Sequence, residues 1–176
     1  MEIFVDVDGV LVNFLKQYTK FYYKETGVLV NWRKIIHYDL SQNFKIEKYK
    51  YLYDRLFYNN IEFMPNSIKY INLLHKNGYK IYFSTACVTY ESMIGKFELL
   101  RKTFKFFSIE NFIVLGCKNY LYTKNGILID DSPYTFEKSV MPAKICYSWL
   151  YNRNVKNVDL KTNNWHTIYT YILDKL

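Results

Sequence analysis

Two kinds of apolar pattern alternate along much of the chain. Between the short runs described below, apolar residues recur every three to four positions, which is typical of amphipathic helices. Continuous runs separated by helices or loops are typical of strands in a parallel sheet whose two faces are both covered. The runs stand at residues 3–5, 79–83, 112–115, 127–129 and 145–147. The pattern therefore predicts an α/β protein.

Helix signals occupy the intervals between these runs. One helix is expected to begin at Asn66 or Ser67 as N-cap and to end at Gly78, because glycine commonly follows the last helical turn. A longer amphipathic helix is predicted over about residues 90–106, and a final helix begins at about Trp165. From residue 64 onward, helices and strands alternate.

Residues 15–63 break this alternation. Helical spacing predicts helices over about 12–26, 32–37 and 45–58, and the first is ended by Gly27. No strand signal appears between the first run and residue 79. We therefore expect an all-helical cap inserted after the first strand and packed over the sheet edge. The predicted division is a core of residues 1–14 and 64–176 and a cap of residues 15–63.

Composition narrows the classes that the chain can belong to. A length of 176 residues suits one core domain, and no run reaches the roughly 18 apolar residues of a membrane span. The three cysteines lack metal-ligand spacing, and the first strand begins at once, so a reduced, cytoplasmic protein without a signal peptide is expected. The net charge of +8 comes from dispersed lysines. Codon bias of an AT-rich genome explains such a composition, and a preference for anionic ligands is the alternative.

Polar residues suited to phosphate chemistry follow the predicted strands. Asp6 and Asp8 follow the first strand, Thr85 ends the second, and Asp130 and Asp131 end the fourth. If the strands are parallel, these ends meet at one edge of the sheet, where open α/β sheets bind ligands. Closely spaced acids are costly unless a cation lies between them, so a metal ion and a phosphate ester would fit there.

Hydrolysis of a phosphate monoester would give each residue a task. Asp6 would attack phosphorus, and Asp8 would protonate the leaving alkoxide and then deprotonate water. Mg²⁺ prefers hard oxygen ligands, and it would bind the Asp6 carboxylate, the Asp8 backbone carbonyl and the acidic pair, chiefly Asp131 with Asp130 beside it. Three residues are expected to hold phosphate oxygens: Thr85, Lys118 and Lys96.

The ordered pieces Asp6-Val7-Asp8-Gly9, Thr85, Lys118 and Asp130-Asp131 resemble the haloacid dehalogenase superfamily of phosphohydrolases. The opening run from Asp6 to Phe14 is similar to that of the 5′(3′)-deoxyribonucleotidases. This resemblance implies a Rossmann-like, doubly wound core, a small helical cap and Mg²⁺-dependent dephosphorylation of (deoxy)nucleoside monophosphates. It also implies that Phe14 stacks on the base and that Tyr38 supplies another aromatic contact.

The chain departs from that family's pattern in two places. Ala86-Cys87 follows Thr85 where a Ser-Pro is common, which removes one hydroxyl from the phosphate cradle. The segment from Lys118 to Asp130 is slightly long, so Lys124 could take the place of Lys118.

Other functions stay open at this stage. The same chemistry could act on another small phosphate ester or on a 3′-phosphate at a nucleic-acid end. A non-catalytic, basic nucleic-acid-binding protein is the alternative of a different class, although it has no use for four acids at strand ends. The expected partner is a small nucleotide, with neither a membrane nor a stable nucleic-acid partner, and the chain is expected to be a monomer or homodimer.

Overall fold

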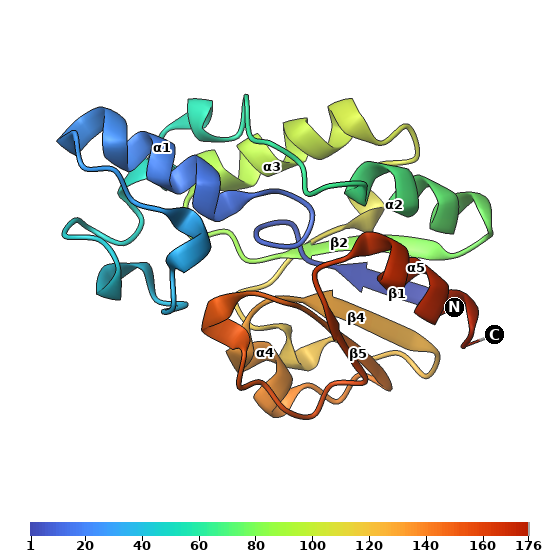
Figure 1. Cartoon of the computed structure of the whole chain (residues 1–176). Coiled ribbons are helices and arrows are strands. Elements are labelled where there is room, and N and C mark those ends of the chain that lie inside the picture. Colours follow the sequence, from blue (N-terminus) through green and yellow to red (C-terminus); the bar gives the residue numbers. More distant parts are fainter. Residues whose placement is uncertain (176) are drawn as a thin grey trace.

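A parallel six-stranded sheet forms the centre of the computed structural model, which describes residues 1–175 (Figure 1). The strand order is β3-β2-β1-β4-β5-β6, and every neighbouring pair is parallel. The strands are β1 (Glu2–Val5), β2 (Lys80–Thr85), β3 (Phe112–Val114), β4 (Gly126–Asp130), β5 (Ala143–Tyr147) and β6 (Leu160–Thr162). The α/β prediction and the parallel sheet are confirmed, and the order is that of a doubly wound fold.

Helices cover the sheet on both sides. Figure 1 shows α2, α3 and α5 on one side and α4 on the other. The α-helices are α1 (Phe14–Thr26), α2 (Ser67–Lys76), α3 (Tyr90–Thr103), α4 (Pro133–Lys138) and α5 (Trp165–Leu173). Short 3-10 turns connect them: η1 (Trp32–Lys34), η2 (Leu40–Gln42), η3 (Lys50–Tyr53), η4 (Arg55–Phe57), η5 (Ile109–Asn111), η6 (Lys118–Tyr120) and η7 (Leu150–Asn152). None of the helices in residues 1–175 could cross a membrane.

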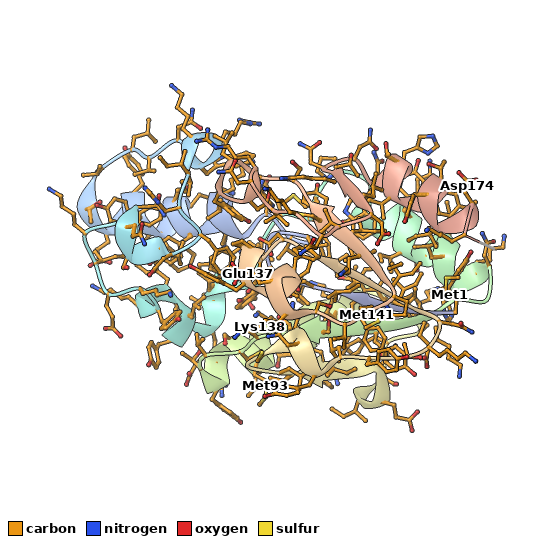
Figure 2. All side chains as sticks on the ribbon, turned by 90° about the horizontal axis from the view of Figure 1, so that it is seen from below. Met1, Met93, Glu137, Lys138, Met141 and Asp174 are labelled. Carbon is orange, nitrogen blue, oxygen red and sulfur yellow. The ribbon has the colours of Figure 1, made fainter. Side chains whose placement is uncertain are left out.

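Side chains of β1 alternate between two apolar layers. Ile3 and Val5 join the larger cluster, which includes Ile71 of α2 and Ile168 of α5. Phe4 points to the opposite face and packs in a smaller cluster with Leu121, Leu128 and Met141. Figure 2, seen from below, shows Glu137, Lys138 and Met141 on this second side. Both faces of the sheet are covered at β1. This explains why residues 3–5 of the strand are all apolar.

The segment of residues 15–63 contains α1 and four 3-10 turns and no named strand. An isolated bridge between Val12 and Phe63 brings its two ends together beside the sheet. Asn13 caps α1 by accepting a hydrogen bond from the backbone N–H of Lys16, and Gly27 ends it in the left-handed region with φ 71°. The division into a core and a cap stays a prediction.

Several details of the predicted elements were wrong. The helix expected over 32–37 is the 3-10 turn η1, because the backbone at Ile35 is extended, and the helix expected over 12–26 begins at Phe14. The helix expected over 45–58 is two 3-10 turns, η3 and η4, because Asp54 between them is extended and its side chain accepts a hydrogen bond from the N–H of Leu56. The helix expected over 90–106 ends at Thr103. Strand β6 and helix α4 were not predicted, since one is a half-buried edge strand and the other is six residues long.

Candidate active site

The candidate site lies where the strand order changes direction, between β1 and β4. These strands are neighbours in the sheet although more than 110 residues separate them in the chain, and Val5 pairs with Ile129. Asp6 follows β1, Asp130 ends β4 and Thr85 ends β2. Ligands of open α/β sheets bind beyond the carboxyl ends of strands at such a position. The expected convergence of these strand ends on one edge is confirmed.

Asp6 is buried, and its two carboxylate oxygens differ. Oδ1 accepts a hydrogen bond from the backbone N–H of Val7 at 2.8 Å and lies 2.8 Å from Nζ of Lys118. Oδ2 accepts no hydrogen bond from any group within residues 1–175. One oxygen is therefore held in place while the other is free to react.

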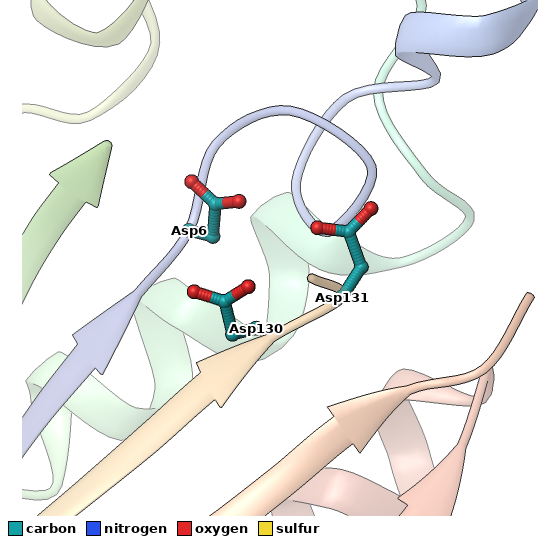
Figure 3. Close-up of side chains that lie close together, drawn as sticks. All are labelled: Asp6, Asp130 and Asp131. Carbon is teal, nitrogen blue, oxygen red and sulfur yellow. The ribbon is translucent and has the colours of Figure 1, made fainter. Parts of the chain in front are cut away.

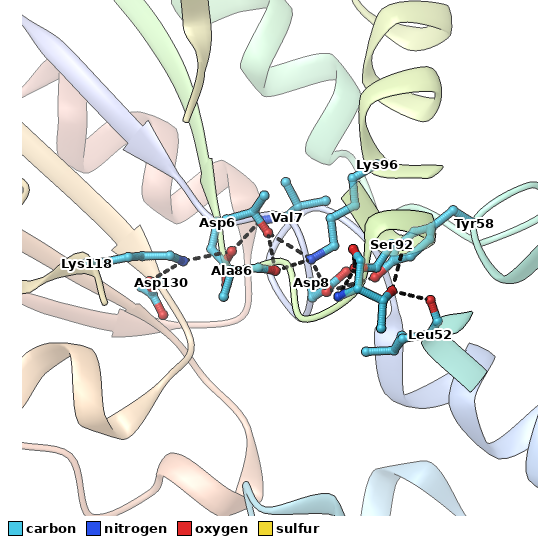
Figure 4. A network of polar contacts seen from close by, with 12 residues as sticks. Asp6, Val7, Asp8, Leu52, Tyr58, Ala86, Ser92, Lys96, Lys118 and Asp130 are labelled. Atoms are coloured by element: carbon cyan, nitrogen blue, oxygen red, sulfur yellow. Dashed lines mark hydrogen bonds and ion pairs between the residues drawn. The ribbon is translucent and has the colours of Figure 1, made fainter. Parts of the chain in front are cut away.

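Lys118 lies between Asp6 and Asp130 and pairs with both. Its ammonium group lies 2.8 Å from Oδ1 of Asp6 and 2.7 Å from Oδ2 of Asp130 (Figure 4). Burial lowers the pKa of Lys118, but the charges of Asp130 and Asp6 outweigh it and raise the pKa, so the side chain stays protonated. Lys124, the alternative from the sequence, is exposed and precedes β4, at the opposite end of the strand from Asp130.

Asp8 is held by a second lysine and by a tyrosine (Figure 4). Its Oδ2 lies 2.8 Å from Nζ of Lys96 and accepts a hydrogen bond from the hydroxyl of Tyr58 at 3.1 Å. The same ammonium group donates to Oγ1 of Thr85 at 3.0 Å and to the carbonyl of Ala86 at 2.6 Å. Burial raises the pKa of Asp8, Lys96 lowers it in part, and Asp6 adds to the rise.

Asp6, Asp130 and Asp131 form a cluster that could hold a metal ion (Figure 3). One ligand oxygen from each lies within 4.8 Å of the others, and all three residues are buried. Lys118 neutralises part of this charge, but no lysine, arginine or histidine among residues 1–175 pairs with Asp131, which accepts a hydrogen bond from Tyr151. Burial, followed by the charges of Asp6 and Asp130, holds the pKa of Asp131 well above its usual range. A bound cation would remove this repulsion, so the residues fit a metal ion.

A cavity of about 190 Å³ opens over the acids, and we call it the aspartate cavity. Thr85 and Lys96 line it together with Asp6, Asp8 and Asp131. The segment 14–52 contributes further lining residues: Phe14, Leu15, Tyr38, Leu40, Lys48, Tyr49 and Leu52. Both aromatic residues expected to contact a base, Phe14 and Tyr38, therefore line the same cavity as the acids.

Comparison with known proteins identifies the family. The family model described as 5′ nucleotidase, deoxy (pyrimidine), cytosolic type C protein matches residues 1–176. The chain belongs to this 5′-nucleotidase family. The resemblance seen in the opening run from Asp6 to Phe14 is thereby confirmed.

A relative and two solved structures agree with this assignment. A Staphylococcus aureus protein named "Putative 5′(3′)-deoxyribonucleotidase" is 27% identical over 121 residues, which cover 68% of this chain and 64% of that protein. The match thus spans less than two thirds of the relative's length. A hydrolase from Pseudomonas syringae has a TM-score of 0.60 at 13% identity and covers 100% of this chain and 99% of that one. A haloacid dehalogenase family hydrolase from Deinococcus radiodurans, solved with phosphate and sodium, has a TM-score of 0.60 at 10% identity, with coverages of 98% and 95%. Such likenesses show the haloacid dehalogenase fold.

Two tyrosines of the candidate site were missed in the sequence. Tyr58 is 1% exposed and donates to Asp8, and Tyr151 donates to Oδ2 of Asp131. With 19 tyrosines in the chain, residue type alone could not single out either one. Tyr58 follows η4, far from any strand end, and Tyr151 lies in η7, the turn after β5, where no motif marks it.

Proposed function

We propose that this nucleotidase is a Mg²⁺-dependent phosphomonoesterase that dephosphorylates (deoxy)nucleoside monophosphates through an aspartyl-phosphate. The observation that carries the proposal is the free Oδ2 of Asp6. This oxygen belongs to a buried carboxylate that Lys118 and the N–H of Val7 hold at its other oxygen. Asp6 lines a cavity to which the segment 14–52 contributes aromatic and apolar residues and one lysine, Lys48.

The reaction divides into two displacements. Oδ2 of Asp6 attacks phosphorus, the bond from phosphorus to the ester oxygen breaks, and Asp8 gives its proton to the leaving alkoxide. The Asp8 carboxylate then takes a proton from water as that water attacks phosphorus, and the bond from Asp6 to phosphorus breaks. Phosphate leaves with both aspartates restored. The raised pKa of Asp8 favours the protonated form that the first step needs.

Asp6, Asp130 and Asp131 would hold Mg²⁺, and the backbone carbonyl of Asp8 is the further ligand expected from the sequence. When bound, the ion neutralises charge on the phosphate oxygens and on the three carboxylates. Lys118 contributes a fixed positive charge beside Asp6 whether or not the ion is bound.

Lys96 acts on the phosphate site through its neighbours. It was expected to hold phosphate oxygens, yet its ammonium group is taken up by Asp8, Thr85 and the carbonyl of Ala86. We propose that it positions Asp8 and the hydroxyl of Thr85, and that Thr85 contacts the phosphate. In this arrangement Lys96 does not contact the phosphate, so it does not make up for the serine hydroxyl that is common at position 86 and absent from Ala86.

The aspartate cavity favours a compact substrate. Its volume of about 190 Å³ and the segment that covers it leave little room for a polymer. Phe14 is half-buried and its ring lies 5.4 Å from that of Phe57, so it is held for stacking on a base. The ring of Tyr38 lies 5.5 Å from that of Tyr151, and both residues line the cavity. Other small phosphate esters remain the second candidate.

A substrate panel tests the proposal. Phosphate release would be measured for 5′- and 3′-deoxynucleoside monophosphates, ribonucleotides, sugar phosphates and a 3′-phosphorylated oligonucleotide, with Mg²⁺ and with EDTA. We expect Mg²⁺-dependent release from at least one mononucleotide, abolished in Asp6→Asn and retained in Asp54→Asn, an exposed acid outside the site. Activity confined to sugar phosphates would overturn the substrate assignment, and activity in Asp6→Asn would overturn the mechanism.

A further inference from the structure

A second and larger cavity lies outside the aspartate cavity. It has a volume of about 760 Å³, within the range of about 300–1,000 Å³ that small-molecule sites occupy. The chain contains three tryptophans, and all three line it: Trp32, Trp149 and Trp165. We call it the tryptophan cavity. It shares no lining residue with the aspartate cavity.

The wall of the tryptophan cavity carries unpaired positive charges but, within residues 1–175, no unpaired negative charge. Arg33 and Arg153 line the cavity, are exposed, and form no ion pair with any acid within residues 1–175. The one acid that lines it, Glu62, is paired with Lys16 and Lys20. Two guanidinium groups are therefore available to an anion, and guanidinium matches phosphate through paired hydrogen bonds.

Aromatic surface accompanies these arginines. The guanidinium group of Arg33 lies 4.3 Å from the ring centre of Trp32, and the rings of Trp32 and Trp149 meet at 5.9 Å and 67°. Trp32 and Trp149 are both half-buried, so part of each ring faces the solvent. Planar rings stack on such surfaces while arginines bind attached phosphates.

The wall of this cavity also contacts the loop of residues 6–10, which carries the proposed reactive acids and which we call the catalytic loop. The indole N–H of Trp149 donates to the carbonyl of Gly9 at 2.8 Å, and that of Trp165 donates to the carbonyl of Val10 at 3.2 Å. These carbonyls are consecutive and directly follow Asp8. Trp149 also stacks on Tyr151, at 5.9 Å and 11°, and Tyr151 donates to Asp131.

We propose that the tryptophan cavity is a second binding site, for a nucleoside phosphate, whose occupant acts on the catalytic loop. Its arginines take the phosphates and its tryptophans take the base. A ligand that shifts Trp149 or Trp165 would move the Gly9 and Val10 carbonyls beside Asp8. The inference goes beyond the proposed function, because binding here requires neither Mg²⁺ nor turnover.

Tryptophan fluorescence tests this site directly, since every tryptophan lines it. Titration with dTTP in EDTA separates it from the aspartate cavity, where acids without a metal ion would repel phosphates. We expect a saturable fluorescence change, and a Kd at least tenfold weaker in the double variant Arg33→Ala/Arg153→Ala. The matched control is Arg55→Ala/Arg101→Ala, which removes the chain's other two arginines, both exposed and outside the cavity. Thermal unfolding of both doubles shows that they fold.

The outcomes are distinct from those of the substrate panel. Absence of a fluorescence change in EDTA, or an equal Kd in both double variants, would overturn the site. With binding established, saturating dTTP is expected to change the turnover of the preferred substrate at least twofold in the control double, with excess Mg²⁺, and not in Arg33→Ala/Arg153→Ala. Equal turnover with and without dTTP in the control would overturn the action on the loop. A protein inactive on every substrate would still give the fluorescence result.

Discussion

Nζ of Lys96 lies 2.8 Å from Oδ2 of Asp8, and the lysine side chain is 2% exposed. A lysine buried this deeply has few alternatives to the three acceptors around it, which are Asp8, Thr85 and the carbonyl of Ala86. The helix α3 that carries Lys96 therefore fixes both the proposed acid and the proposed phosphate hydroxyl.

Removing this charge should move the pH profile. Asp8 must be protonated to serve as acid, and the Lys96 ammonium lowers its pKa against the effect of burial. In Lys96→Met the pKa of Asp8 rises further, so the alkaline limb of kcat moves to higher pH while kcat itself falls. Lys102→Met, at an exposed position of the same helix, serves as control. An alkaline limb that stays in place or moves to lower pH would show that Asp8 is not the titrating acid.

Leaving groups separate the roles of the two aspartates. In Asp8→Asn, turnover of a nucleoside monophosphate should fall by about 10²–10⁴-fold, the usual contribution of general acid–base catalysis. Release of p-nitrophenol from p-nitrophenyl phosphate should fall far less in the first turnover, because that leaving group needs no proton. Asp6→Asn should lose activity on both substrates. Burst kinetics with the two substrates measure this, and equal losses in Asp8→Asn would contradict the assignment.

Repulsion among Asp6, Asp130 and Asp131 should lower the thermal stability of the metal-free protein. The raised pKa of Asp131 means that the metal-free protein is stabilised below the unfolded-state pKa and loses this contribution as pH rises through the folded-state value. In EDTA, we therefore expect a lower Tm at pH 8 than at pH 5, with a smaller decrease in Asp131→Asn.

Adding Mg²⁺ at pH 8 should restore the Tm of the wild type and have little effect on Asp131→Asn. A change of about 1 kcal/mol corresponds to about 2–4 °C for a chain of this size. Glu137→Gln, an exposed acid on α4, should behave as wild type. An equal response to Mg²⁺ in Asp131→Asn would show that this residue is not a ligand.

Gly95 should tolerate no side chain. A Cβ there would lie 2.7 Å from Cδ2 and 3.0 Å from Cβ of Tyr58, which is 1% exposed and cannot move away. Gly95→Ala should destabilise the protein by about 1–3 kcal/mol, as overpacking does, and should reduce kcat by displacing the Tyr58 hydroxyl from Asp8. Gly116→Ala meets nothing within 4 Å and should change neither property. Urea unfolding and kcat measure the two effects, and an unchanged kcat would separate Tyr58 from catalysis.

The central strands could be predicted because they are buried on both faces. Runs such as 127–129 contain only apolar residues, so a short window suffices. Strand β6 gives no such signal, since all three of its residues are half-buried and Lys161 stands in the middle. The spacing of Leu52 and Leu56 fits a helix, yet Leu56 is 61% exposed, because the local hydrogen bond to the Asp54 side chain favours a turn instead.

The residues of the candidate site also fall into a group that the sequence predicts and a group that it does not. Asp6, Thr85 and Asp131 follow strands, and the topology of a parallel sheet brings them together. Tyr58 reaches Asp8 by packing of a segment 50 residues away in the chain, and Tyr151 reaches Asp131 from the turn after β5. Neither contact is encoded in the spacing of residues along the chain. The choice between Lys118 and Lys124 likewise depended on the path of the chain between β3 and β4.

The position of β1 between β2 and β4 has a consequence for biosynthesis. The two proposed reactive acids, Asp6 and Asp8, are translated more than 100 residues before Lys118, Asp130 and Asp131. A nascent or truncated chain that ends before β4 has the proposed nucleophile but lacks the acidic pair beside it, and one that ends before η6 also lacks Lys118. The proposed phosphatase activity therefore requires β4 to pair with β1, so turnover would report when the middle of the sheet has closed.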